Sequence, residues 1–212
     1  MIEHIAIFGA SGFARETADI AYALGLTPIF VTHEQNEIDN WSHDEEIILD
    51  AEVERWKHLK FIIGIGENTI RRQVAERYKA RLNFTNLIHP SATFGKGQID
   101  QISIKTGVII CAGTRFTNNI EVGNFSIFNL NVTVGHNAIV EEFTNIAPGV
   151  SVSGNVHIEK GCWIGTGAVI NQGTPKGKLL IGADTIIGSG SVVVKSCDPC
   201  AVYVGAPARR IK

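Results

Sequence analysis

Histidine is the side chain best suited to move a proton near neutral pH, because its pKa lies close to that range. The 212-residue chain contains seven histidines, and most histidines in proteins have structural rather than chemical roles. His136 differs from the others because it follows Gly135, lies two residues after the apolar Val134 and falls in the middle of a repeated segment. We therefore expect His136 to act as a general base.

Other features of the composition exclude several classes of function. The formal net charge is −2 and no long basic run occurs, which argues against a nucleic acid or an anionic membrane as a partner. Of the four cysteines, Cys197 and Cys200 have C-x-x-C spacing, but one such pair supplies only half of a zinc site, so we expect no metal. With no signal peptide and no apolar run of about 20 residues, we expect a cytoplasmic protein.

The elements that must position His136 repeat with a period of six. Every sixth residue from Ile104 to Ile170 is large and apolar, and the residue four positions further on is mostly small or β-branched. A helix repeats its apolar face every three to four residues and a flat sheet alternates, so neither explains this period. The pattern predicts a triangular parallel β-helix with one hexad per side and about eighteen residues per turn.

Stacking and interruptions of the prism follow from the same count. Residues eighteen apart should lie on adjacent coils, about 4.8 Å apart, so His136 is expected between Asn118 and Gly154. Asn137 then falls in a column of asparagines, which suits corners with positive φ and gives it a structural alternative to a chemical role. Segment 171–180 contains five extra residues and should therefore project from the prism. There it could cover a ligand, contact a neighbouring subunit or lie in solvent.

The first 85 residues predict a different kind of unit. Strands and helices are expected in the order Ile5–Phe8, helix Phe13–Leu24, Thr27–Val31, Phe61–Ile65 and a helix capped by Asn68. This order favours parallel strands with crossover helices. We predict a small Rossmann-like parallel α/β domain at residues 1–85, followed by a parallel β-helix with a C-terminal tail at residues 86–212. The unit is short and lacks G-x-G-x-x-G, which argues against a dinucleotide cofactor.

Five short motifs occur in a fixed order along the chain, and their residues are Gly9-Ala10-Ser11-Gly12, Ile65-Gly66-Glu67-Asn68, Gly135-His136-Asn137, Ser153-Gly154-Asn155-Val156 and Val204-Gly205-Ala206-Pro207-Ala208-Arg209-Arg210-Ile211. With the hexads, this set resembles the left-handed β-helix sugar acetyltransferases, a family that includes the UDP-4-amino-sugar N-acetyltransferases of the bacillosamine pathway and the sialic acid O-acetyltransferases. The resemblance covers essentially the whole chain. It implies a left-handed β-helix, a homotrimer with sites between subunits, acetyl-CoA as co-substrate and no metal.

The resemblance also implies roles for individual residues. The catalytic positions match His136 and Asn137. The positions that contact acetyl-CoA match Asn145, Gly154, Thr166, Gly188 and Ser189. The positions that contact the nucleotide-linked sugar match Ser11, Gly12, Phe13, Thr32, His33 and Gly66.

Some of these positions depart from the family. Asn137 stands where the bacillosamine-pathway enzymes have an acidic residue that raises the basicity of the catalytic histidine. An amide cannot stabilise an imidazolium as a carboxylate does, so either another group orients His136 or a less basic histidine suffices. Asn145 replaces a second histidine but can still donate a hydrogen bond. Phe13 also replaces a histidine. Thr32 and His33 replace two acidic residues, which leaves the nucleotide open among UDP, dTDP and GDP.

The resemblance implies direct transfer, in a ternary complex, of an acetyl group from acetyl-CoA to a nucleotide-linked 4-amino-4,6-dideoxy sugar for surface glycan synthesis, such as lipopolysaccharide or O-antigen. In that reaction His136 would deprotonate the amine, and a backbone N–H would polarise the thioester carbonyl. Glu141 and Glu142 are candidates to orient His136 by proximity in sequence. Two alternatives stay open: O-acetylation of sialic acid or a related sugar, and a non-catalytic β-helix for assembly or binding.

Overall fold

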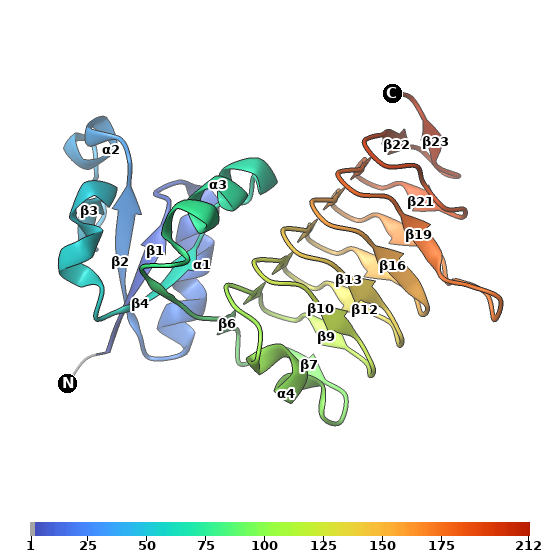
Figure 1. Ribbon diagram of the computed structural model, residues 1–212, viewed down its shortest axis with the longest axis horizontal. Helices are drawn as coiled ribbons and strands as arrows, with labels where there is room; N and C mark the ends of the chain where they lie inside the picture. The colour runs from blue at the N-terminus through green and yellow to red at the C-terminus, as the bar shows by residue number, and fades with distance from the viewer. Residues whose placement is uncertain (1–2) are drawn as a thin grey trace.

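The N-terminal unit is built on a five-stranded parallel sheet with strand order β3-β2-β1-β4-β5. The computed structural model describes residues 3–212 (Figure 1). The strands of this unit are β1 (His4–Phe8), β2 (Thr27–Thr32), β3 (Ile47–Leu49), β4 (Lys60–Ile63) and β5 (Asn83–Phe84). Its helices are α1 (Gly12–Ala23), α2 (Gln35–Asp39), the 3₁₀ helix η1 (Asp50–Trp56) and α3 (Asn68–Tyr78).

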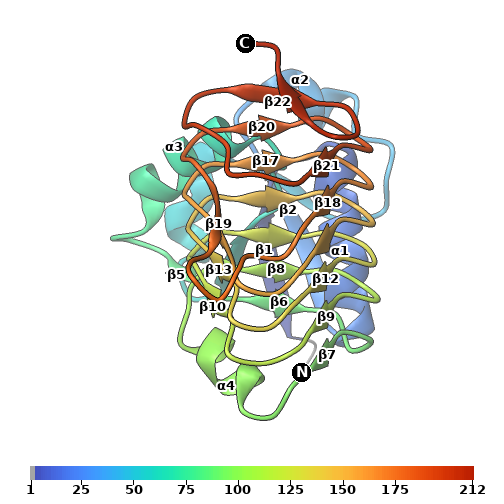
Figure 2. The same ribbon diagram turned by 90° about the vertical axis from the view of Figure 1, so that its right-hand side faces the viewer.

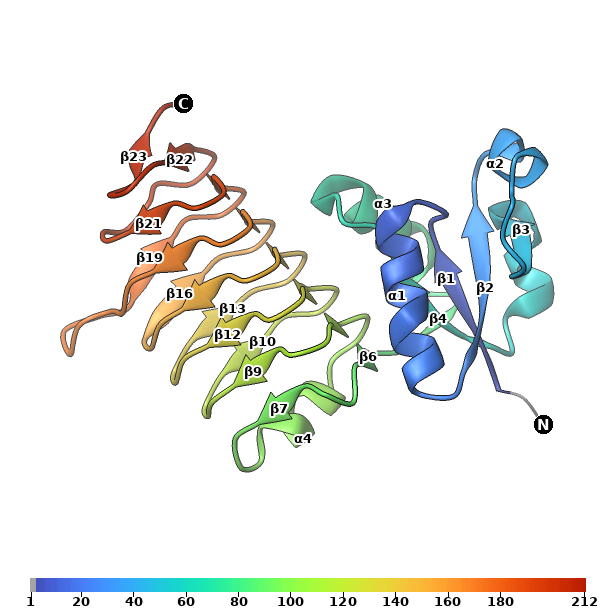
Figure 3. The same ribbon diagram turned by 180° about the vertical axis from the view of Figure 1, so that it is seen from behind.

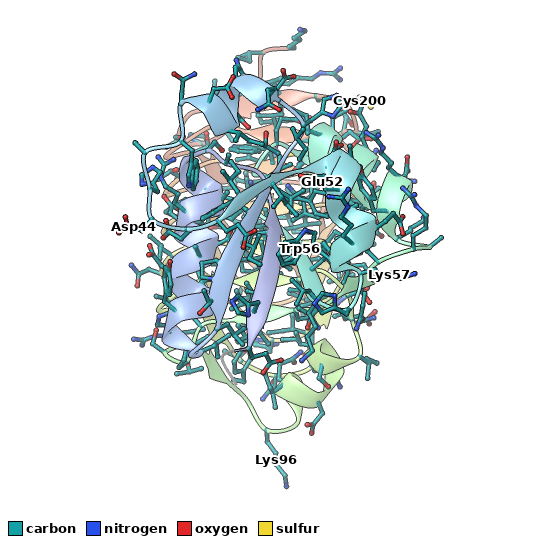
Figure 4. All side chains as sticks on the ribbon, turned by 90° about the vertical axis from the view of Figure 1, so that its left-hand side faces the viewer. Asp44, Glu52, Trp56, Lys57, Lys96 and Cys200 are labelled. Carbon is teal, nitrogen blue, oxygen red and sulfur yellow. The ribbon has the colours of Figure 1, made fainter. Side chains whose placement is uncertain are left out.

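Both faces of this sheet are covered, as parallel sheets with crossover helices require. One face packs Ile5 and Ile7 against the small residues of α1, and the opposite face packs Phe8 and Phe61 against α3 and η1. Figure 4 looks onto this unit and shows α1 and η1 to either side of the strands, with Trp56 of η1 labelled. Among the described residues, no helix is long and apolar enough to cross a bilayer.

The rest of the chain winds into a parallel β-helix with three sides, whose strands stack one above the next in Figure 2. The eight-stranded side contains β6 (Leu87–Ile88), β8 (Ile109–Ile110), β11 (Ile127–Phe128), β14 (Asn145–Ile146), β17 (Trp163–Ile164), β20 (Ile186–Ile187), β22 (Val202–Val204) and β23 (Arg209–Arg210). The six-stranded side contains β7 (Thr93–Phe94), β9 (Arg115–Phe116), β12 (Thr133–Val134), β15 (Ser151–Val152), β18 (Val169–Ile170) and β21 (Val192–Val193). The four-stranded side contains β10 (Glu121–Val122), β13 (Ile139–Val140), β16 (Val156–Ile158) and β19 (Leu179–Ile181).

The predicted period and stacking are confirmed by the strand register. Val134 pairs with Val152, and Asn145 pairs with Trp163, so each partner lies eighteen residues further along the chain. The large apolar residues predicted to point inward, such as Val134 and Ile164, are buried in one continuous core. Across the interruption, Ile158 pairs with Ile181, which confirms that the register resumes after the extra residues.

Two local predictions were wrong. Ile104 is not an inward anchor: it is 79% exposed, because α4 (Gln98–Ser103) occupies the corresponding side of the first coil and buries Ile102 instead. Asn68 does not cap α3. Glu67 is the cap residue and its carboxylate accepts a hydrogen bond from the Ile70 N–H, while Asn68 turns its side chain toward the β-helix.

The α/β unit packs against the outer face of the eight-stranded side, where Ile109 and Ile127 join its core, and against one edge of the prism, and it leaves another edge free. The covered edge is defined by the corners 123–126 and 141–144, between the four-stranded and eight-stranded sides, and Phe125 and Phe143 from these corners join the core of the α/β unit. The open edge is defined by the corners 135–138 and 153–155 and the loop 171–178, between the six-stranded and four-stranded sides. Figures 1 and 3 show this loop projecting from the side of the prism that points away from the α/β unit.

Candidate active site

His136 lies on the open edge, at the corner between β12 and β13, and its side chain is exposed. A Cβ added to Gly154 would lie 2.6 Å from His136 Nε2, so the imidazole packs directly on the glycine of the next coil. Within residues 3–212, the N–H of Gly154 makes no hydrogen bond. At this corner the exposed His136 ring therefore covers a buried glycine whose backbone donor is unused.

Asn137 adopts the left-handed backbone conformation, with φ of 61°. Asn119 and Asn155, one coil before and one coil after, do the same with φ of 57° and 59°. Asparagine tolerates this conformation better than most residues with a Cβ atom. The geometry therefore supports the structural interpretation of Asn137.

Glu141 is engaged elsewhere. Its carboxylate lies 2.8 Å from Nε2 of His157 and accepts a hydrogen bond of 3.0 Å from the Lys160 N–H. No side chain of residues 3–212 forms a hydrogen bond with the His136 imidazole. The single chain thus supplies no carboxylate in place of the acidic neighbour that the family has.

A cavity of about 480 Å³ opens at the carboxyl ends of β1, β2 and β4. The strand order reverses around β1, and such a switch point is where open α/β sheets bind ligands. Three predicted substrate residues line the cavity, namely Ser11, Thr32 and His33. The other three predicted substrate residues, Gly12, Phe13 and Gly66, lie beyond its lining.

The wall of this cavity is organised around Asp50, whose side chain is 12% exposed. Its carboxylate lies 3.1 Å from His33 Nδ1 and accepts hydrogen bonds from Arg77 at 3.3 Å and from the Tyr78 hydroxyl at 2.9 Å. Burial, together with the hydrogen bond to Asp50, raises the pKa of Tyr78. Asp50 was not among the predicted site residues, although it follows a short apolar run, as residues at strand ends do.

Two more carboxylates stand at the end of β2. The Thr32 hydroxyl donates to Glu37 and accepts a hydrogen bond of 3.1 Å from the Glu34 N–H. Glu34 and Glu37 both line the cavity. These acidic residues were not predicted, because nothing in the sequence shows that the turn into α2 brings them back to the end of β2.

Asn145 lies at the boundary between the two units and is 3% exposed. Its amide nitrogen donates to the Gly66 carbonyl at 2.8 Å, and its Oδ1 is buried without a partner within residues 3–212. Phe13 is close by, since a Cβ on Gly66 would lie 4.0 Å from its ring. Two of the departures from the family, Phe13 and Asn145, therefore meet at Gly66.

Arg71 of α3 is completely buried at the same boundary. Its guanidinium donates to the carbonyls of Gly66 at 2.8 Å, Phe125 at 2.8 Å and Phe143 at 3.0 Å, and to Asn68 Oδ1 at 2.7 Å. Burial lowers its pKa to about 9, which still leaves it charged at neutral pH. This contact between the units was not predicted, because the helix pattern gives no sign of a buried arginine.

The remaining predicted cofactor residues lie on a third edge. Thr166, Gly188 and Ser189 form corners between the eight-stranded and six-stranded sides, where the Gly190 N–H donates to the Thr166 carbonyl at 2.8 Å. Gly154 is therefore the one predicted cofactor residue that a single chain brings next to His136. The others lie on the third edge or, like Asn145, under the α/β unit.

Three of the four cysteines are unsuited to nucleophilic chemistry. Burial raises the pKa of Cys111 and Cys162 to about 12 and that of Cys197 to about 11, so these thiols stay protonated near neutral pH. Cys200 is exposed at the C-terminal end of the β-helix, as Figure 4 labels it. Within residues 3–212, no three His, Cys, Asp or Glu side chains gather as metal ligands.

Comparison with known proteins places this geometry in a family. The family described as the PglD N-terminal domain matches residues 4–78. A GDP-perosamine N-acetyltransferase from Escherichia coli is 34% identical over 153 residues, which cover 72% of this chain and 67% of the relative. The chain belongs to the PglD-type hexapeptide-repeat sugar acetyltransferases.

Solved structures agree over the full length. WeeI from Acinetobacter baumannii has a TM-score of 0.86 at 26% identity and covers 99% of this chain and 100% of its own. The acetyltransferase domain of PglB from Neisseria gonorrhoeae, solved in complex with acetyl coenzyme A, has a TM-score of 0.87 at 25% identity with 100% of both chains covered. The predicted fold class and the predicted class of enzyme, an acetyl-CoA-dependent acetyltransferase, are confirmed. The individual site residues stay predictions.

Proposed function

We propose that this protein transfers the acetyl group of acetyl-CoA to the amino group of a GDP-linked 4-amino-4,6-dideoxy sugar for surface glycan synthesis. The observation that carries the proposal is the corner at which the His136 ring packs on Gly154 and the Gly154 N–H is unused. The matched relative from Escherichia coli is named for an N-acetylation of GDP-perosamine, which favours an amine over a hydroxyl as acceptor.

The chemistry of the transfer needs a base and an oxyanion donor. His136 accepts the proton that the amine loses as its nitrogen forms a bond to the thioester carbon. The Gly154 N–H donates to the negative charge that develops on the thioester oxygen. The carbon–sulfur bond then breaks, and His136 returns the proton to the departing thiolate of CoA. Both substrates are bound together, and no covalent bond to the enzyme forms.

The sugar nucleotide occupies the cavity of the α/β unit, with its diphosphate near the turn at Ser11 and Gly12. Free N–H groups at a helix start attract phosphate. The carboxylates of Glu34 and Glu37 line this cavity, and we assign them to the base of the nucleotide. Guanine offers two adjacent N–H donors that one carboxylate can accept together, whereas uracil and thymine each offer a single N–H between two carbonyls. This donor–acceptor match, together with the GDP-linked substrate in the name of the relative, supports guanine over uracil or thymine.

A homotrimer with sites between subunits completes the arrangement. In one chain the α/β unit covers one edge of the prism, and His136 lies on the edge that points away from it. A second copy that brings its α/β unit and the edge bearing Thr166, Gly188 and Ser189 against His136 would supply the missing walls. The division into domains at residue 85 and the cytoplasmic location stay predictions.

An assay of CoA release with acetyl-CoA and GDP-, UDP- or dTDP-linked 4-amino sugars tests the proposal. We expect turnover with the GDP-linked amine, and a loss of about 10²- to 10⁴-fold in kcat for His136→Ala, with the trimer intact by light scattering. His157→Ala is the matched control, because this histidine also lies on the β-helix but pairs with Glu141. Near-normal turnover of His136→Ala would show that His136 is not the general base. Turnover with hydroxyl acceptors and not with amines would replace the proposed N-acetylation by O-acetylation.

A further inference from the structure

The loop 171–178, between β18 and β19, begins in direct contact with the corner that carries His136. The Gly173 N–H donates to the Gly154 carbonyl at 3.0 Å, and a Cβ on Gly173 would overlap the Asn155 carbonyl oxygen. The hydrogen bond and the close approach therefore hold the first residues of the loop against Gly154, on which the His136 ring also packs.

Two side chains fasten the rest of the loop to the same corner. The Asn155 side-chain nitrogen donates to the Thr174 carbonyl at 2.8 Å. The Lys178 ammonium donates to the Asn137 carbonyl and lies 3.3 Å from Asn155 Oδ1. Lys178 is thus the loop side chain that reaches back across the corner, to the residue that follows His136.

These bonds hold the backbone on the C-terminal side of His136. The Asn155 N–H donates to the His136 carbonyl at 2.8 Å, and Lys178 donates to the next carbonyl along, that of Asn137. The direction in which the imidazole leaves the corner depends on these two peptide groups. Since one donor is on the loop and the other is bonded to it, the order of the loop and the position of the ring are coupled.

We propose that Lys178 is a positioning residue, which holds loop 171–178 against the open edge and thereby keeps the His136 ring over Gly154. The proposal rests on the proposed role of His136 as general base. Lys178 touches no reacting atom, and its effect passes through the Asn137 peptide group. A small displacement of a catalytic group lowers the rate of the chemical step more than it lowers the affinity for substrate.

The experiment compares Lys178→Met, Lys178→Arg and Lys176→Met. Lys176 is in the same loop and its ammonium forms no hydrogen bond with the corner, so it is the matched control. We expect kcat to fall about tenfold in Lys178→Met with little change in KM for acetyl-CoA. Lys178→Arg, which keeps a charged donor, should recover most of kcat, and Lys176→Met should stay within about twofold of wild type.

Two readouts need no substrate. Hydrogen exchange of the amides of residues 172–178 should become faster in Lys178→Met, and so should the modification of His136 by diethyl pyrocarbonate, followed by mass spectrometry. Unchanged modification of His136 would overturn the proposal, and so would faster exchange with unchanged kcat. If the wild type acetylates no amino sugar, the proposed function fails, while the modification rate still decides whether Lys178 holds His136.

Discussion

The covered edge and the open edge of the prism are built from similar corners of the coils but have opposite roles. At the covered edge, Arg71 and Asn145 are buried and nearly all of their polar atoms are bonded within one chain. At the open edge, His136 is exposed and the Gly154 N–H has no partner within residues 3–212. The polar groups of one edge are used up in holding the α/β unit to the β-helix. At the other edge, the His136 imidazole and the Gly154 N–H have no partner within residues 3–212, and this difference separates scaffold from site.

The largest expected effect is on stability and comes from the covered edge. Arg71→Met should lower the free energy of unfolding by at least about 3 kcal/mol, because it leaves several buried carbonyls without donors. Arg72→Met is the control. Arg72 is half-exposed, and its 3.5 Å ion pair with Asp184 should contribute under about 1 kcal/mol. Urea denaturation measures the free energy of unfolding of both variants. Equal losses in the two would show that the buried hydrogen bonds of Arg71 contribute no more than the exposed ion pair of Arg72.

The next effect is on activity and comes from the open edge. In Gly154→Ala the new methyl group would displace the His136 ring, so kcat should fall by about 10²-fold while the melting temperature changes little. Gly135→Ala is the contrasting variant, because its Cβ would lie 2.6 Å from the backbone nitrogen of Gly154 and should destabilise the coil. Thermal unfolding alongside kinetics separates the two. A loss of activity in Gly154→Ala that merely follows its melting temperature would contradict the contact with His136.

The smallest effect is expected at Asn137. Asn137→Gly should leave activity and stability nearly unchanged, because glycine adopts a φ of 61° without strain. Asn137→Val should instead cost about 1–2 kcal/mol of stability, because a β-branched residue resists that conformation. Denaturation and CoA release check both variants. A large drop in kcat for the glycine variant, with stability retained, would give the Asn137 side chain a chemical role after all.

Much of the β-helix could be predicted from the sequence, because its coils are built from local repeats. The stacking of His136 on Gly154 follows from a count of eighteen residues. The same count was wrong at Ile104, where α4 replaces a strand and no hexad pattern signals the replacement. The eighteen-residue count also does not show what the projecting loop contacts. Lys178 was therefore not predicted as a functional residue.

The site in the α/β unit could be predicted only in part. Thr32 and His33 were predicted from the resemblance to the family, and both line the cavity. Asp50 was missed because β3 is three residues long and its segment shows no clear period. A residue at the end of an unrecognised strand cannot be assigned to the ligand side of the sheet.

The sequence by itself determined the kind of scaffold and the neighbours of His136 along the prism, because stacking in a β-helix depends on a short period that each coil repeats. Only the tertiary structure decided how the two units meet. Asn68 and Arg71 of α3 meet Asn145 of the β-helix, and the partners of all three are mostly backbone carbonyls, which carry no sequence signal. For the same reason, only the structure could place His136 on the edge that points away from its own α/β unit.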